Sequence, residues 1–278
     1  MKYLFWNTNK RNVDTYICKL SCEYTPTIIA LAEYERDIYA LVELLKKETN
    51  LDYMVLEQMA CRVHILIQAK LADKVEHCQD HRNYTIKILP YNSFHEKHIV
   101  VFLHLPSKMQ DNRERNRSLL EQIVTAVERI DTSERRKVLI FGDFNLNPYE
   151  DAMTYLTGCN AVSSRNIAKK ISRKSRYEEE KQYFYYYNPM WNFLGDEKEP
   201  CGTFYYTSTP DHSRYWNTFD QFVVSPELMN DIEEVKIVKD IGEISLGDEH
   251  GIPKISDHYP LFFKLGGLDD GKQSVGKV

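Results

Sequence analysis

The stretch V-L-I-F-G-D-F-N-L-N-P, residues 138–148, decides how the whole chain is interpreted. Its first four residues are apolar, which is typical of a short buried strand. Gly142 ends this run, and Asp143 and Asn145 follow immediately. A rigid strand that ends in a carboxylate and an amide suits a site that aims polar groups into a cleft. A tight turn is the alternative, because Gly, Asp and Asn are also favoured turn residues.

Other expected strands end on polar residues in the same way. These residues are Asn7 after the apolar run 3–6, Glu33 after the run 27–32, and His104 after the run 98–103. Glu33 has a second interpretation, as an acid at a helix N-terminus, because residues 34–47 show helical periodicity. Both interpretations of Glu33 can hold together.

Two strands late in the chain bring further acids and an imidazole. Asp220 lies within an expected strand at 216–224, and Asp257 and His258 come just before the last one. Carboxylate oxygens are the ligands that Mg²⁺ prefers. Imidazoles and carboxylates also act as acid, base and oxyanion stabiliser in hydrolysis. The set predicts metal-assisted phosphoester hydrolysis, and no serine or cysteine nucleophile motif competes with it.

An amphipathic helix is expected over residues 113–129, because apolar residues recur there at i, i+3 and i+4. Arginines stand at its N-terminus, where the helix dipole disfavours cations. Arg113 is therefore a candidate contact for an anionic substrate, and a solvated helix face is the alternative. Loops are expected at 74–83 and 231–250, and surface positions for His95 and His98.

A basic segment followed by aromatic residues has the most unusual composition in the chain. Six basic residues and no acid lie between residues 161 and 176, and they include Lys169, Lys170, Arg173 and Lys174. Aromatic runs follow at 183–187 and 204–206. Cations interleaved with aromatic rings are typical of a groove for single-stranded nucleic acid. The alternative is a surface helix followed by an aromatic strand that packs in the core.

The bulk composition is that of a globular protein. The chain has 278 residues, of which 42% are hydrophobic and 28% charged, with a net charge of −5, so any attraction for a polyanion must be local. We expect one domain over 1–265 and a disordered tail over 266–278. Six cysteines without C-x-x-C spacing, no signal peptide and no apolar stretch of membrane-spanning length favour the cytoplasm and exclude membrane insertion.

Six sequence blocks occur in an informative order. They are W-N-x-N, I-I-A-L-x-E, H-L-P-S, G-D-F-N, F-D-Q-F-V-V-S and S-D-H-Y-P-L. Together they cover residues 1 to about 265 and resemble the endonuclease/exonuclease/phosphatase superfamily. The resemblance implies an α/β fold, a four-layer α/β sandwich of two packed mixed β-sheets flanked by helices, with the site at one edge.

The resemblance also implies a metal side of the site. Glu33 is similar to the principal Mg²⁺ ligand of the family, with Asn7 beside it and Asp257 as a further metal-side carboxylate. Asn9 is implied as a contributor on the substrate side. Mn²⁺ is an alternative ion at such an oxygen-rich site.

Catalytic roles are implied for a second group. Asp143 resembles the carboxylate that orients or deprotonates the attacking water, and Asn145 resembles a contact to the scissile phosphate. His258 resembles the imidazole that stabilises the transition state, oriented by Asp220. His104 resembles the second histidine of the deoxyribonuclease-like and sphingomyelinase-like branches.

Three departures from the family pattern leave the branch open: Ala32 replaces a usual Gln, Asn9 lacks a following Gly, and Gln221 replaces an aromatic residue. The leading hypothesis is a Mg²⁺-dependent phosphodiesterase that hydrolyses nucleic acid, DNA or RNA. The alternative is a phosphoesterase acting on a small or lipid-linked phosphate. A non-catalytic binding module of the same fold is the third hypothesis. The sequence indicates no protein partner.

Overall fold

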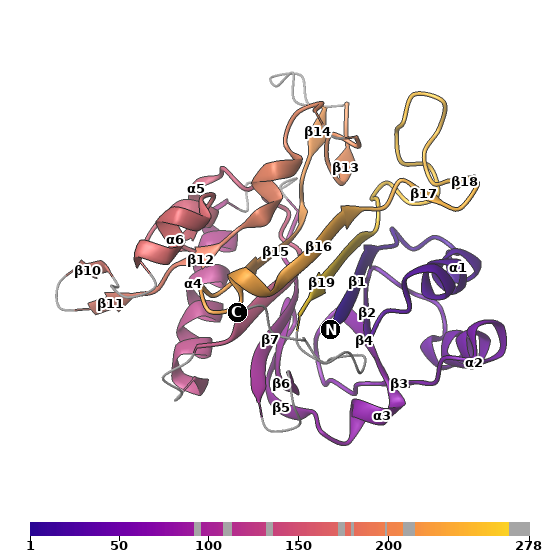
Figure 1. Ribbon diagram of the computed structural model, residues 1–278, viewed down its shortest axis with the longest axis horizontal. Coiled ribbons are helices and arrows are strands. Elements are labelled where there is room, and N and C mark those ends of the chain that lie inside the picture. Colours follow the sequence, from indigo (N-terminus) through magenta and orange to yellow (C-terminus); the bar gives the residue numbers. More distant parts are fainter. Residues whose placement is uncertain are drawn as a thin grey trace, which may run out of the picture.

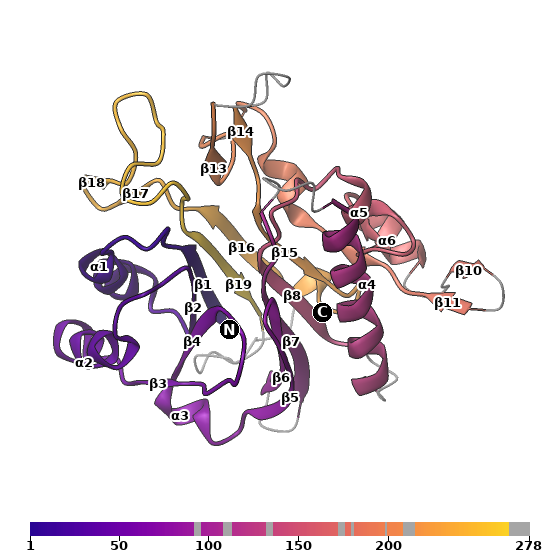
Figure 2. The ribbon, with the colours of Figure 1, turned by 180° about the vertical axis from the view of Figure 1, so that it is seen from behind.

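A computed structural model describes residues 1–91, 96–107, 113–131, 136–171, 176–178, 181–197, 199–207 and 215–266. Two large mixed β-sheets pack together, and helices cover their outer faces (Figures 1 and 2). The expected four-layer α/β sandwich is therefore confirmed. Among the described residues, no helix is long and apolar enough to cross a membrane.

The first sheet has six strands and the second has seven. Across the first sheet the strands are β16 (Ile232–Ile237), β19 (Leu261–Leu265), β1 (Lys2–Asn7), β2 (Ile28–Ala32), β4 (Val63–Gln68) and β3 (Tyr53–Val55). Across the second they are β5 (Glu76–His81), β6 (Tyr84–Pro90), β7 (Lys97–His104), β8 (Val138–Asp143), β15 (Asp220–Val224), β12 (Tyr186–Tyr187) and β9 (Ala161–Val162). The pairs β1–β2, β7–β8 and β9–β12 are parallel.

The continuous apolar run of β8 follows from burial on both faces. Leu139 and Phe141 belong to the core shared with the first sheet, whereas Val138 and Ile140 belong to the core beneath α4. Successive strand residues point to opposite faces, so a strand covered on both sides must be apolar throughout. The sequence prediction of a buried strand is confirmed.

Aromatic rings lock the two sheets together. Phe222 from the second sheet stacks on Phe263 from the first, with ring centroids 4.1 Å apart. Tyr3 stacks on the same Phe263 at 4.8 Å and meets Phe141 edge-on at 5.6 Å. Ring contacts of this kind add to the free energy of burial. Because the core is close-packed, the strand ends of the two sheets are fixed relative to one another.

The helices lie on both outer faces, with α1 and α2 on one side and α4, α5 and α6 on the other (Figure 1). Their bounds are α1 (Asp14–Tyr24), α2 (Ile38–Thr49), α3 (Ala69–Ala72), α4 (Arg113–Ile130), α5 (Asp151–Thr154) and α6 (Arg165–Ile171). Small two-stranded sheets are formed by β10 (Arg176–Glu178) with β11 (Lys181–Tyr183), by β13 (Phe204–Tyr205) with β14 (Trp216–Asn217), and by β17 (Asp240–Ile241) with β18 (Ile244–Ser245). Leu120, Ile123 and Val127 of α4 pack on the second sheet.

Two segments predicted as loops are strands. Residues 76–81 of the segment 74–83 form β5, and residues 232–237 of the segment 231–250 form β16. Both strands lie at the edge of a sheet and pair on one side only. A strand at an edge is held by its backbone hydrogen bonds and tolerates polar side chains, so hydrophobic pattern alone does not reveal it.

The surface prediction for His98 is wrong. Its side chain is buried, its Nε2 lies 2.6 Å from the hydroxyl of Tyr3, and its Nδ1 lies 3.2 Å from the carbonyl oxygen of Leu89. Burial is tolerated because both ring nitrogens have partners. His95 and the expected tail from residue 267 onward lie outside the described residues.

Candidate active site

Strand register brings three polar side chains into one row at an edge of the second sheet. In the parallel pair β7–β8, His104 lies opposite Asp143. In the antiparallel pair β8–β15, Asp220 lies opposite the same Asp143. Neighbouring strands stand about 5 Å apart, so the three side chains emerge as close neighbours. The recurrence of polar residues at strand ends therefore reflects a shared position in space.

The first sheet contributes Asn7 and Glu33 to the same place. Parallel pairing of β1 and β2 sets Asn7 beside Ala32, and Glu33 follows directly. The Asn7 amide nitrogen donates to Asp143 Oδ2 over 2.9 Å and lies 3.5 Å from Glu33 Oε1. Its oxygen accepts from the backbone N–H of Asn9 at 3.1 Å. Asn7 thus connects Glu33 of the first sheet with Asp143 of the second. Rotation of its amide group by about 180° would turn the oxygen toward both carboxylates.

Glu33 adopts a backbone conformation that non-glycine residues rarely use. Its φ is +50°, and its carbonyl oxygen accepts from the Thr8 hydroxyl at 2.8 Å and the Lys10 N–H at 2.9 Å. Backbone strain of this kind costs about 1–3 kcal/mol and is concentrated at functional sites. The following helix, α2, begins at Ile38 and is capped by Asp37. Glu33 is therefore not a helix N-terminal acid, and that alternative is wrong.

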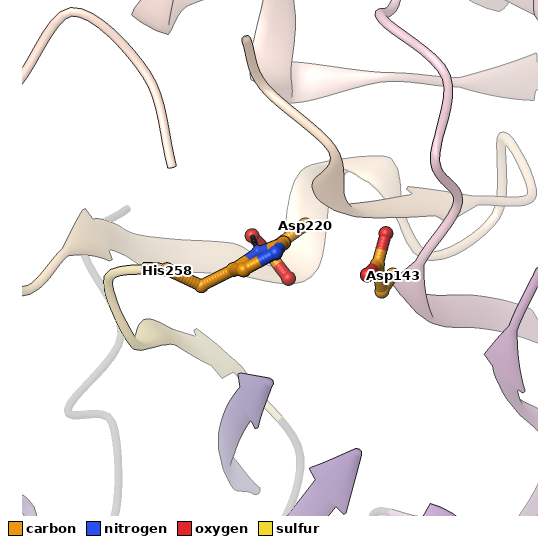
Figure 3. Close-up of side chains that lie close together, drawn as sticks. All are labelled: Asp143, Asp220 and His258. Carbon is orange, nitrogen blue, oxygen red and sulfur yellow. Dashed lines mark hydrogen bonds and ion pairs between the residues drawn. The ribbon is translucent and has the colours of Figure 1, made fainter. Parts of the chain in front are cut away.

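His258 and Asp220 form a buried acid–imidazole pair. Nδ1 of His258 lies 2.7 Å from Asp220 Oδ2, and the indole N–H of Trp6 donates to the His258 carbonyl at 2.9 Å. Burial lowers the pKa of His258, but the Asp220 charge and hydrogen bond outweigh it and raise the pKa to about 9. The ring is therefore cationic near neutral pH. Figure 3 shows the carboxylate of Asp220 against the ring and Asp143 to one side.

Asp143 is almost fully buried beside other acids. Burial raises its pKa, and the negative charge of Asp220 raises it further. Its Oδ1 accepts from the backbone N–H of Asn145 at 2.8 Å. His104 lies between the two sheets, with Nε2 3.8 Å from Asp143 Oδ2 and 3.6 Å from Glu33 Oε1.

These side chains open into one pocket of about 1100 Å³. Asn7, Glu33, Asp143, Asn145, Asp257 and His258 all line it. The wall toward α4 and α5 adds Arg117, Tyr149 and Tyr155, and another wall adds aromatic residues at 204, 206 and 219. A pocket that combines apolar walls with convergent polar and titratable groups is the expected form of an active site.

The donor set fits a hard divalent cation. Within the described residues, Asp143, Asp220 and His258 offer ligand atoms within 4.8 Å of one another, and Glu33 lies near them. Oδ1 of Asp220 and Nδ1 of His104 are buried and make no hydrogen bond. Neighbouring buried carboxylates repel one another unless a cation or a proton compensates them. Oxygen ligands of this kind suit Mg²⁺, Ca²⁺ or Mn²⁺.

Within that group, the His258–Asp220 hydrogen bond already occupies one ligand atom of each residue. A cation is therefore accommodated better on the side of Glu33, where the carboxylate is partly exposed to the pocket. Asp257 lines the same pocket, with Oδ1 4.0 Å from His258 Nε2.

Positioning residues that the sequence motifs did not single out surround the site. The Ser256 hydroxyl donates to the Asn7 carbonyl at 2.7 Å and so ties the His258 loop to β1. The Thr203 hydroxyl accepts from the N–H groups of Phe219 and Asp220, both at 3.1 Å. Ser256 stands inside the S-D-H block and could have been inferred from it, whereas Thr203 carries no local signal.

The predicted substrate-binding residues are distributed differently. Asn9 has a φ of +44° and adjoins the site through Asn7, but it does not line the pocket formed by the described residues. Arg113 begins α4, whereas Lys169 and Lys170 lie in α6, and the side chains of these three are not described. Arg173 and Lys174 lie outside the described residues.

The aromatic run 183–187 does not face the pocket. Tyr185, Tyr186 and Tyr187 are buried, and no residue between 156 and 203 is among the described residues that line the pocket. The structure therefore agrees with the alternative in which these tyrosines pack in the core. Figure 1 places α6 and the β10–β11 hairpin on the side of the molecule that carries α4.

Solved structures of the endonuclease/exonuclease/phosphatase fold resemble the chain along nearly its whole length. The catalytic domain of human Nocturnin with a bound sulfate anion is 12% identical, with a TM-score of 0.57, and the match covers 95% of this chain and 93% of that one. The endonuclease domain of TRAS1, a telomere-specific non-LTR retrotransposon, is 12% identical, with a TM-score of 0.55 and coverage of 95% and 97%.

A third similar structure is D. rerio TDP2 complexed with a single-strand DNA product, which is 16% identical, with a TM-score of 0.55 and coverage of 95% and 97%. The chain therefore has the fold of this superfamily, as its sequence blocks predicted. No family model matches the sequence, and no curated protein matches it significantly.

Proposed function

We propose that the protein is a divalent-metal-dependent phosphodiesterase that hydrolyses nucleic acid. The observation that carries the proposal is the convergence of Glu33, Asp143 and His258, from both sheets, on a single pocket. The similar TRAS1 domain is an endonuclease, and the similar D. rerio TDP2 was solved with a DNA product. Both support a nucleic-acid substrate.

In this proposal Glu33, with Asp257 and Asn7, would hold a Mg²⁺ ion, and Mn²⁺ would fit the same oxygen donors. A bound cation would neutralise charge on the scissile phosphate and polarise it. The raised pKa of Asp143 suits its proposed role, because a carboxylate whose charge is destabilised by burial accepts a proton more readily from an attacking water. Asn145 would contact the scissile phosphate from the pocket wall.

His258 would stabilise the developing negative charge from the other side. With a pKa of about 9 it is protonated at neutral pH and presents Nε2–H to the pocket, while Asp220 holds Nδ1. A preorganised cationic donor of this kind strengthens as charge builds on the phosphate oxygens. His104, between Glu33 and Asp143, would act as the second imidazole.

One observation favours the alternative of a small or lipid-linked phosphate. The lining contains six carboxylates, of Glu33, Glu114, Asp143, Glu150, Asp151 and Asp257. Arg117 is the one arginine or lysine among the described lining residues. Acidic walls repel additional phosphates, so a substrate with a single phosphate in the pocket is favoured on electrostatic grounds.

We also propose a cytoplasmic location. All six cysteines are free thiols, and unpaired thiols are typical of a reducing compartment.

A hydrolysis panel tests the proposed function. Single- and double-stranded DNA and RNA, inositol phosphates and a phosphocholine lipid are compared in Mg²⁺ and in EDTA. Asp143→Asn serves as the blank, and Asp52→Asn, an exposed carboxylate beside Lys46, is the matched control. Metal-dependent cleavage of a nucleic acid by wild type and the control, but not the blank, is expected. Cleavage of a small phosphate ester alone would contradict the proposed nucleic-acid substrate. Inactivity on every substrate would favour a non-catalytic binding module.

A further inference from the structure

Three aromatic rings form a shelf along one wall of the pocket. The aromatic shelf consists of Phe219, Phe204 and Tyr206, all of which line the pocket. Phe204 lies nearly parallel to Phe219 at a centroid distance of 5.2 Å and to Tyr206 at 6.1 Å. Its ring also lies 4.6 Å from the ring of His258. The middle ring of the shelf therefore lies beside the proposed phosphate-stabilising imidazole, with Phe219 and Tyr206 on either side of it.

The backbone holds the shelf rigidly. Phe204 pairs with Asn217 in the β13–β14 hairpin and forms an isolated antiparallel bridge with His258. The N–H of Tyr206 donates to the Tyr215 carbonyl at 2.8 Å. Side chains two apart in an extended strand share a face, so residues 204 and 206 point to the pocket together. Tyr205 points the other way and packs on Trp216 at 5.1 Å.

Exposure increases along the shelf from its base to its rim. Phe219 is buried, Phe204 is half-buried, and Tyr206 is 38% exposed. An aromatic ring that only filled the core would be buried, as the rings of Tyr185–Tyr187 are. The rim of the shelf thus presents ring surface to the pocket without a partner from the core.

We propose that the aromatic shelf binds the nucleobase of the nucleotide whose phosphate is held at His258. This inference rests on the proposed function and specifies how the pocket selects a nucleotide. A base lies one sugar away from its phosphate, and Phe204 of the shelf lies one ring contact from His258. Aromatic side chains stack on any base because every base has a π face. Of the other lining tyrosines, Tyr149 is followed by acidic residues in the sequence and Arg117 already covers the Tyr155 ring, so the shelf is the wall best suited to an uncharged planar ring.

Calorimetric binding in Mg²⁺ tests the shelf without turnover. The probes are adenosine 5′-monophosphate, ribose 5-phosphate and inorganic phosphate. Stacking of one base predicts that wild type binds the nucleotide about tenfold more tightly than ribose 5-phosphate. Tyr206→Leu and Phe204→Leu are expected to remove most of that difference and leave ribose 5-phosphate binding unchanged.

The matched control is Tyr215→Leu, an exposed tyrosine beside the same strand pair that does not line the pocket. Its preference for the nucleotide is expected to equal that of wild type. Equal binding of nucleotide and sugar phosphate by wild type, or no binding of the nucleotide, would overturn the proposal. Melting curves identify any variant that fails to fold, and the exposed Tyr206 makes the safer substitution.

A cleavage assay separates this inference from the proposed function. It compares two oligonucleotides, one with a normal nucleotide and one with an abasic residue beside the scissile linkage. Wild type is expected to cleave the normal strand about tenfold more efficiently, and Tyr206→Leu to cleave both alike. If wild type cleaves both equally well, the shelf is wrong and the phosphodiesterase stands. If it cleaves neither but still prefers the nucleotide in binding, the proposed function is wrong and the shelf stands.

Discussion

The strand ends around Asp143 and the basic–aromatic segment beyond residue 161 differ in the sequence signal that makes each a candidate site. In the first region the signal is position, since polar residues recur where apolar runs end. In the second the signal is composition. Asn7, Glu33 and Asp143, from the ends of three strands of the two sheets, line one pocket, whereas Tyr185–Tyr187 of the second region are buried in the core.

The difference shows which sequence signals carry information about a site. Parallel neighbours bring the ends of their strands to the same edge, so position along the chain translates directly into position in space. Composition does not translate in this way, because aromatic residues serve cores and binding surfaces equally well. Four predictions test this contrast.

The largest effect is expected from His258, which the first region holds against the pocket. His258→Gln removes the cation that faces the substrate and is expected to lower kcat by about a thousandfold. It is also expected to lower Tm, because Asp220 keeps a buried charge without its cationic partner. Steady-state kinetics in Mg²⁺ check this. His250→Gln, an exposed histidine in a nearby loop, is the control and is expected to keep wild-type turnover. Equal rates for the two variants would remove His258 from the proposed mechanism.

Gly142 tests how closely the end of β8 packs against the neighbouring strand β7. Its φ is +143°, and a Cβ there would lie 1.9 Å from the carbonyl oxygen of Leu103. Gly142→Ala is expected to lower the free energy of unfolding by about 3 kcal/mol or more, through overpacking and backbone strain. Urea denaturation measures it. Gly242→Ala, with φ +56° and open space around it, is expected to cost about 1 kcal/mol. Similar losses in both variants would contradict the close packing.

The third prediction concerns His98, which is buried between the two sheets. Burial lowers the pKa of His98 to about 3. Below the unfolded pKa of about 6.5, the unfolded chain takes up a proton that the folded chain excludes, so stability falls as pH falls. Wild type is expected to lose about 2 kcal/mol more than His98→Gln between pH 7 and pH 5, at about 1.4 kcal/mol per pH unit. Urea titrations at both pH values measure the difference. Parallel losses in the two proteins would show that His98 is protonated in the fold.

The smallest effect is expected in the second region. We propose that the cations of Lys169, Lys170, Arg173 and Lys174 contact only a strand long enough to leave the pocket. Replacing all four with alanine is expected to weaken binding of a long oligonucleotide severalfold and reduce its salt slope, by up to about 0.7 per lost contact. A dinucleotide is expected to bind unchanged. Weaker dinucleotide binding would place the segment at the pocket after all.

Sequence reasoning predicted the sandwich and most of its strands because β8 and its neighbours are apolar wherever both faces are covered. It missed β5 and β16 because edge strands are held by backbone pairing, and polar side chains such as Glu233 and Glu234 interrupt their apolar pattern. It misplaced His98 because the partners of a buried histidine, here Tyr3 and Leu89, come from distant strands.

For the candidate site, the strand-end residues could be predicted to lie together, but the supporting contacts could not. The position of Glu33 at the end of an apolar run is visible in the sequence. Its positive φ is not, because the hydrogen bonds from Thr8 and Lys10 that accompany it form only in the fold. Phe204 and Tyr206 occur in an aromatic run much like 183–187, and only the bridge to His258 distinguishes them. Such long-range contacts leave no local periodicity in the sequence.

The central claim is that strand ends from two sheets together form one cation site. A titration with Mn²⁺ followed by electron paramagnetic resonance tests it in wild type, Glu33→Gln and Glu35→Gln. Glu35 is a matched control, since it lies two residues away and pairs with Lys10 at the surface. We predict that wild type and Glu35→Gln bind the ion alike and that Glu33→Gln binds it at least tenfold more weakly. Equal binding by all three proteins would contradict the account.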